Sequence, residues 1–130
     1  MNNQISLSFN QPDLAEHLAL LGEDGLDQLD FGVIGFDKDT VVRLYNECES
    51  KAAGLKPDRM LGQPIFTVVA PCMNNYLVAQ RFEDAFETGA ALDATINYVL
   101  TLRMRPVKVA LRLLAAPSAA IRYVLVDRLA

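Results

Sequence analysis

The carboxyl-terminal part of the chain contains three apolar stretches rich in β-branched residues, at 92–102, 107–115 and 120–128. Pro106 and the pair Pro117-Ser118 separate them. Because proline interrupts regular backbone hydrogen bonding, each stretch is confined to strand length and each break marks a turn. The pattern predicts three antiparallel strands, and it constrains the fold more than any other feature of the sequence.

Two further strands are predicted near the amino terminus. The apolar run FGVIGF at 31–36 is followed by the turn segment DKDT and then by VVRLY at 41–45, which is typical of a hairpin. Ahead of this hairpin, Leu14, Leu18 and Leu21 recur at helical spacing between Pro12 and Gly22. We expect a short amphipathic helix over 12–21 that ends at Gly22.

Helices are predicted between the two groups of strands. The segment NECESKAAGL closes at Gly54, Pro57 starts a second short helix, and residues 76–88 form a longer helix that stops near Gly89. Strands at both ends with helices between them indicate an α+β fold. We expect one five-stranded antiparallel sheet, covered on one face by the middle helices, with a helical cap before it.

The length of 130 residues, of which 52% are hydrophobic, fits a single compact domain. Within it we expect an amino-terminal helical cap at 1–25 and the main domain at 26–130. The net charge of −4 argues against a nucleic-acid partner. The charge is uneven, because residues 1–49 hold ten acidic and two basic residues whereas 50–130 hold six acidic and ten basic residues. The acidic segment could therefore lie on a basic sheet of the same chain or of a partner.

The cysteines and the histidine offer no metal site. Cys48 and Cys72 are too few for a disulfide scaffold, and His17 has no partner at ligand spacing. The amino terminus lacks the pattern of a signal peptide, and no run of about 18 apolar residues is present. We expect a cytoplasmic protein with reduced thiols and no membrane contact.

Two places could carry chemistry. Tyr45 and Glu49 lie four residues apart where the second strand enters a helix, so both side chains can point to one side. Cys72 follows the apolar run Val68-Val69-Ala70-Pro71. From spacing alone, ordinary packing is the better explanation of each of them.

These residues occur in an order that resembles the photoactive yellow protein family, small blue-light photoreceptors of the PAS superfamily. The resemblance runs from about Leu26 to Arg128 and includes LYNECES, VVAPC and RMRPVKV. It implies a PAS fold and a p-coumaric acid (4-hydroxycinnamoyl) chromophore bound as a thioester to Cys72. It also implies that Tyr45 and Glu49 contact the phenolate end and that Met104 lies over the pocket.

The resemblance further implies a light-driven switch. Tyr45 and a protonated, buried Glu49 can both donate hydrogen bonds to a phenolate. Photoisomerisation would displace the phenolate, which takes the proton of Glu49 and leaves a buried carboxylate without a partner. Because an unpaired buried charge costs several kcal/mol, local unfolding is expected, most plausibly in the amino-terminal helices.

Three positions in the expected pocket depart from the family pattern. Ala53 stands where the family usually has a threonine, Leu55 where it has an arginine, and Leu100 where it has a phenylalanine. These changes predict a more open and more apolar pocket around the chromophore.

Other functions remain open. The first alternative is a non-photosensory PAS module that binds another small aromatic ligand or a protein in a reshaped pocket. An acyl-transfer enzyme with Cys72 as nucleophile is not expected, because no base accompanies the thiol. A signalling protein should act downstream, and the stripe Leu14, Leu18 and Leu21 could form a homodimer or cover the chain's own sheet.

Overall fold

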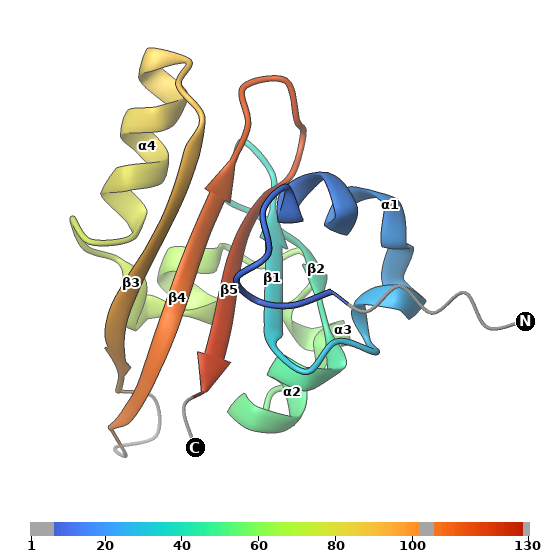
Figure 1. The fold of residues 1–130 in the computed structure, drawn as a ribbon. Helices are drawn as coiled ribbons and strands as arrows, with labels where there is room; N and C mark the ends of the chain where they lie inside the picture. Colours follow the sequence, from blue (N-terminus) through green and yellow to red (C-terminus); the bar gives the residue numbers. More distant parts are fainter. Residues whose placement is uncertain (1–6, 102–105, 129–130) are drawn as a thin grey trace, which may run out of the picture.

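The computed structural model describes residues 7–101 and 106–128, and a five-stranded sheet forms its centre. The strand order is β2-β1-β5-β4-β3, and every neighbouring pair is antiparallel (Figure 1). The strands are β1 (Gly32–Phe36), β2 (Val42–Tyr45), β3 (Leu92–Leu100), β4 (Val107–Ala115) and β5 (Arg122–Arg128). The predicted fold class is confirmed, and the amino-terminal hairpin joins the carboxyl-terminal strands through the β1–β5 pair.

Short helices connect β2 to β3. They are α2 (Glu47–Ala53), α3 (Pro57–Met60), the π-helical turn η1 (Ile65–Val69), the 3₁₀ turn η2 (Pro71–Met73) and α4 (Ala79–Thr88). Gly54 ends α2 with φ 72° and Gly89 ends α4 with φ 69°, as predicted, because glycine adopts this left-handed conformation without strain. The sequence did not predict the π-helical turn.

Two predicted helix boundaries were wrong. Helix α1 (Leu14–Leu26) is interrupted at Gly22, where φ is 70° and ψ is 177°, and then resumes to Leu26. Gly22 therefore produces a kink and not an end. Helix α4 begins at Ala79 and not at residue 76, because the Asn75 side chain accepts hydrogen bonds from the amides of Leu77 and Val78 and holds this turn outside the helix.

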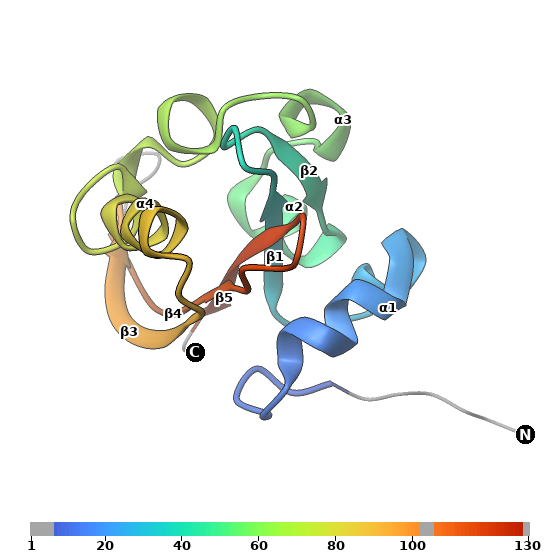
Figure 2. The same cartoon turned by 90° about the horizontal axis from the view of Figure 1, so that it is seen from above.

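The sheet buries apolar side chains on both faces. On β5, Val124 and Val126 face one side whereas Tyr123 and Leu125 face the other, as the alternation of a strand requires. Figure 2 shows α4 on one side of the sheet and α1 on the opposite side. The inner cluster, toward α4, includes Ile34, Phe36, Tyr45, Ile65, Phe66, Val69, Ala70, Met73, Phe82, Leu100, Leu111, Leu113, Val124 and Val126. The outer cluster consists of Leu7, Phe9, Leu14, Leu18, Leu26, Phe31, Val33, Leu114, Tyr123 and Leu125.

The amino-terminal segment covers the chain's own sheet. Leu14 and Leu18 are each 1% exposed within the outer cluster, so these two leucines are not free for a homodimer in this arrangement. On β4, Arg112 donates hydrogen bonds to the carbonyl oxygens of Phe9 (2.9 Å) and Gln11 (2.7 Å), and it forms an ion pair with Asp93 (2.9 Å). The amino-terminal segment therefore lies on the sheet of its own chain, but Arg112 holds it through neutral backbone carbonyl oxygens and not through the acidic side chains on which the prediction rested.

Candidate functional site

Cys72 lies in η2, directly after Pro71, and its half-buried side chain packs against the inner cluster. Its carbonyl oxygen accepts hydrogen bonds from the Tyr98 hydroxyl (2.5 Å) and from Asn75 Nδ2 (3.3 Å). The same Asn75 nitrogen lies 2.6 Å from the Tyr98 hydroxyl. These contacts fix the backbone of Cys72 against β3, so the free thiol has a defined position at the edge of the inner cluster.

Tyr45 is the last residue of β2, and 7% of it is exposed. Its hydroxyl makes no hydrogen bond within the described part of the chain. Burial, followed by the negative charge of nearby Glu49, raises the pKa of Tyr45, while Arg128 acts in the opposite direction. Tyr45 is therefore a neutral phenol whose hydroxyl is free to donate a hydrogen bond.

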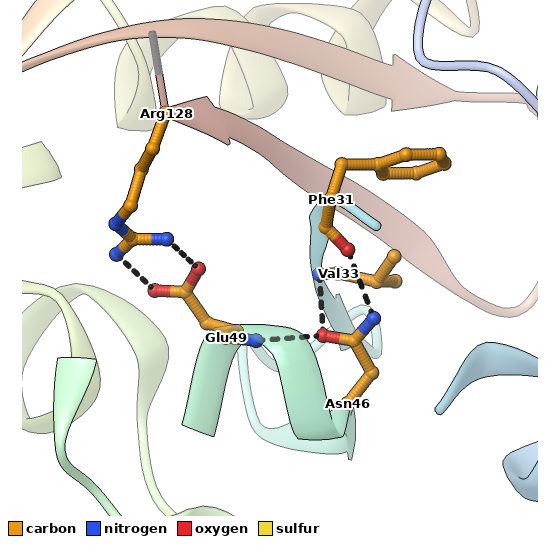
Figure 3. Close-up of polar contacts among 5 residues, drawn as sticks. All are labelled: Phe31, Val33, Asn46, Glu49 and Arg128. Carbon is orange, nitrogen blue, oxygen red and sulfur yellow. Dashed lines mark hydrogen bonds and ion pairs between the residues drawn. The ribbon is translucent and has the colours of Figure 1, made fainter. Parts of the chain in front are cut away.

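The start of α2 is fixed by Asn46, which is buried (Figure 3). Its side-chain oxygen accepts hydrogen bonds from the amides of Glu49 (3.1 Å) and Val33 (2.9 Å). Its side-chain nitrogen donates to the carbonyl oxygens of Leu26 (2.9 Å) and Phe31 (3.0 Å). This N-cap therefore ties α2 to β1 and to the end of α1, and it holds Glu49 on the inner side of the sheet.

Glu49 is 3% exposed and pairs with Arg128 at the end of β5 (Figure 3). Arg128 Nη1 lies 2.7 Å from Oε1 and Nη2 lies 3.0 Å from Oε2. Two parallel contacts of this kind are the geometry of a guanidinium with an ionised carboxylate. Burial alone would lower the pKa of Arg128, but the hydrogen bond and charge of Glu49 outweigh burial and raise it.

Sequence reasoning missed Arg128. A signal was present, because Val124, Val126 and Arg128 alternate along β5 and therefore share the face that packs toward α2. A carboxyl group predicted to be buried on that face needs a partner, and Arg128, the last residue of β5, supplies one. Asn46 was also missed as a positioning residue, although Asn followed three residues later by Glu is a known N-terminal signature.

The remaining predicted site residues divide into three groups. Leu100, 3% exposed, and the half-buried Leu55 contact the same inner cluster as Tyr45 and Cys72. Ala53 is buried on α2. Met104 lies outside the described residues.

The position of Leu55 is set by Ser50. The Ser50 hydroxyl donates a hydrogen bond to the Leu55 carbonyl oxygen (2.7 Å), and the Ser50 carbonyl oxygen accepts one from the Leu55 amide (3.2 Å). The loop after α2 is thus fixed, and it places an apolar side chain where the resemblance implied a cation.

Comparisons with known proteins agree with the fold. The family model described as PAS fold matches residues 26–126. The photoactive yellow protein of Halochromatium salexigens is 34% identical over 104 residues, which cover 78% of this chain and 80% of that protein. The photoactive yellow protein of Rhodothalassium salexigens is 29% identical over 122 residues, covering 94% and 97%.

Solved structures give the same result. The photoactive yellow protein domain of the sensor histidine kinase Ppr from Rhodospirillum centenum has a TM-score of 0.75 and 34% identity, with 82% of this chain and 93% of that chain covered. The PAS domain of the quorum-sensing receptor RpfR from Cronobacter turicensis, in complex with BDSF, has a TM-score of 0.61 and 13% identity, with 79% and 97% covered. The second likeness concerns the fold alone.

The sheet, the helices on its inner face and the matched region define a PAS domain. Within that class, the chain belongs to the photoactive yellow protein family. Both curated relatives carry the name photoactive yellow protein. No helix in the described ranges is long and apolar enough to span a membrane.

Proposed function

We propose that this PAS photosensor carries a p-coumaroyl group bound as a thioester to Cys72. The observation that supports the proposal most directly is the shared inner cluster, which brings the side chain of Cys72 and that of the buried Tyr45 to one apolar region; the Tyr45 hydroxyl makes no hydrogen bond with the other described residues. A thiol for attachment and a donor for an anionic oxygen are the two groups that such a ligand requires. The residues present therefore fit it.

Attachment uses the thiolate of Cys72. Its sulfur forms a bond to the carbonyl carbon of an activated p-coumaroyl donor, the bond from that carbon to the leaving group breaks, and the thiol proton leaves with the released group or with solvent. Once bound, the group supplies absorption of visible light and a double bond that isomerises.

The protein residues would bind and respond as follows. The Tyr45 hydroxyl donates a hydrogen bond to the phenolate oxygen. Glu49, which lies close enough to influence Tyr45 electrostatically, provides a second donor when its carboxyl carries a proton. Glu49 then gives that proton to the phenolate oxygen after illumination. Leu55 and Leu100 add apolar surface to this region, where Tyr45 and Glu49 would be the groups that donate to the phenolate oxygen.

Reconstitution tests the proposal. We expect the purified chain, mixed with activated p-coumaric acid, to gain a visible absorption band and the mass of one acyl group. Cys72→Ala should abolish both, whereas Cys48→Ala should retain both, because Cys48 lies on α2 and is not part of the inner cluster. A colourless wild-type chain of unchanged mass would refute the proposal.

That negative result would favour the alternative, a PAS module for another ligand. The observation behind the alternative is that Leu55 and Leu100 make the inner cluster more apolar than the family pattern. The RpfR domain, which has the same fold, is described in complex with BDSF.

We further propose that the domain passes its signal to another protein, as expected from the similar domain in a sensor histidine kinase. A cytoplasmic location and a homodimer stay predictions. Cell fractionation tests the location, and light scattering of the purified chain tests the association.

A further inference from the structure

The contact between Glu49 and Arg128 joins two elements that are distant in sequence. Glu49 belongs to α2, and Arg128 is the last residue of β5 (Figure 3). The Glu49 side chain is 3% exposed and that of Arg128 is 23% exposed, so solvent screens this pair far less than a surface pair. The ion pair therefore connects the charge of one pocket residue to the end of a strand in the sheet.

The backbone of β1 leaves space for this carboxylate. A Cβ atom added at Gly32 would lie 2.1 Å from Glu49 Oε1, closer than a real Cβ atom approaches another atom, and 3.1 Å from Glu49 Cδ, which is a tight contact. Glu49 Oε1 is also the oxygen nearest to Arg128, at 2.7 Å. The glycine and the guanidinium thus form a site for the Glu49 carboxyl group, and the N-cap Asn46 holds the backbone amide of Glu49.

Within the described residues, Arg128 is the positively charged group among those that shift the pKa values of Tyr45 and Cys48. Burial, and then the charge of Glu49, raises the pKa values of Tyr45 and Cys48, whereas Arg128 lowers both. Asp30, before β1, and Asp127, on β5, add negative charge near Cys48. A carboxylate at Glu49 therefore depends on Arg128 for its compensation.

We propose that Arg128 is a positioning residue that receives the Glu49 carboxylate when Glu49 has given up its proton. This inference rests on the proposed function. In the step, the O–H bond of Glu49 breaks, the proton passes to the phenolate oxygen, and the electron pair stays on the carboxylate, whose charge the guanidinium balances through two N–H···O contacts. The bidentate arrangement is the form without the proton.

This changes the output expected from the family resemblance. The resemblance implied that deprotonated Glu49 is an unpaired buried charge that drives unfolding of the amino-terminal helices. With Arg128 in place the charge is paired, so that driving force is removed. The signal is instead the formation of a contact between α2 and the end of β5, and it emerges at the carboxyl-terminal end of the sheet.

The first experiment needs no pigment. Infrared or carbon NMR spectra of the chain labelled at glutamate, with the Glu49 signal assigned by its loss in Glu49→Gln, report whether Glu49 is protonated at neutral pH. We expect a carboxylate in the wild type. In Arg128→Gln, the ratio of ionised to protonated Glu49 should fall at least about tenfold, because a charge-assisted pair is lost.

Two variants control this measurement. Arg128→Lys should restore most of the carboxylate signal, since it keeps the charge and loses the fork geometry. Arg43→Gln, which removes the ion pair between the exposed Arg43 on β2 and Asp37 in the turn before it, should leave the Glu49 signal unchanged. Equal ionisation of Glu49 in wild type and Arg128→Gln would overturn the proposal. If Arg128→Gln does not fold, a protonated Glu49 in either the wild type or Arg128→Lys would overturn it.

A second experiment follows the signal in the chain carrying the pigment. Hydrogen exchange at 122–128 should slow on illumination in the wild type and stay unchanged in Arg128→Gln. Faster exchange confined to 14–26 in both proteins would contradict the proposal. A chain that takes up no pigment refutes the proposed function, whereas the spectra of the pigment-free chain still decide whether Arg128 is the counterion of Glu49.

Discussion

Two arginines of adjacent strands each hold another segment against the sheet, one on each face. Arg112 on β4 binds the amino-terminal segment over the outer cluster, and Arg128 on β5 binds α2 on the inner side. Both form bidentate ion pairs, Arg112 with Asp93 and Arg128 with Glu49. The two ion pairs differ in what surrounds the carboxylate.

Arg112 has hydrogen-bond acceptors besides its carboxylate partner, whereas among the described residues Arg128 has only the Glu49 carboxylate. The Asp93 side chain is 56% exposed, and Arg112 also binds the carbonyl oxygens of Phe9 and Gln11, which accept hydrogen bonds at any pH. Glu49 is buried and is the acceptor that Arg128 uses among the described residues. The same pairing chemistry therefore gives a permanent attachment on one face and, on the other, an attachment that depends on one proton.

The largest expected effect comes from removing the outer arginine. Arg112→Met should lower the free energy of unfolding by about 2–4 kcal/mol, because it removes the donor of the buried Phe9 carbonyl and of the part-buried Gln11 carbonyl and breaks the Asp93 pair. Chemical denaturation measures this loss. Hydrogen exchange should become faster over residues 9–18, which Arg112 helps to hold on the sheet.

Arg43→Gln is the matched control for this loss. Its partner is also an aspartate, but the Arg43 side chain is 55% exposed, so the expected cost is less than about 1 kcal/mol. Equal losses in the Arg112 and Arg43 variants would show that the backbone contacts of Arg112 contribute nothing, and the contrast between the faces would fail.

The ion pair between Glu49 and Arg128 on the inner face can be broken without removing either charge. Gly32→Ala places a Cβ where Glu49 Oε1 lies, so the carboxylate must move away from Arg128. We expect a loss of about 1–3 kcal/mol in the free energy of unfolding, measured by denaturation. In a Glu49→Ala background the same glycine substitution should cost less than half as much, because the clashing atoms are gone. An equal cost in both backgrounds would place the strain elsewhere.

Much of the fold was predictable because its signals are local. The strands of the carboxyl-terminal part follow from apolar alternation and proline breaks, and α2 follows from a capping signature closed by Gly54. The end of α1 was not predictable from Gly22 alone. Glycine permits a positive φ, but whether the chain turns away or resumes a helix depends on Leu26 packing into the outer cluster.

The site was predictable only in part, because only some of its residues are marked by local sequence signals. Cys72, Tyr45 and Glu49 lie in short motifs, and a family resemblance transfers through such motifs. The partner of Glu49 depends on the β1–β5 register, which pairs Gly32 with Val126 and so brings Arg128 beside α2. No local pattern encodes that register, because it results from residues nearly 100 positions apart finding each other in the folded sheet.

The smallest expected effect is the pH dependence of the outer attachment. The hydrogen bond from Arg112 lowers the pKa of Asp93 from its ordinary value of 3.8, against a smaller opposing effect of burial. A folded-state pKa below the unfolded one contributes stability above about pH 4, and this contribution is lost as the pH falls through the lower, folded value. Because Asp93 is mostly exposed, we expect less than about 1 kcal/mol.

Asp93→Asn isolates this contribution. The free energy of unfolding of the wild type should exceed that of the variant at neutral pH, and the difference should disappear in acid, where the wild-type carboxylate is protonated as well. If the difference between wild type and Asp93→Asn stayed constant into acid, the stabilisation would come from side-chain shape and not from charge. The outer attachment would then not depend on ionisation at all, and the contrast with Glu49 would be sharper than proposed.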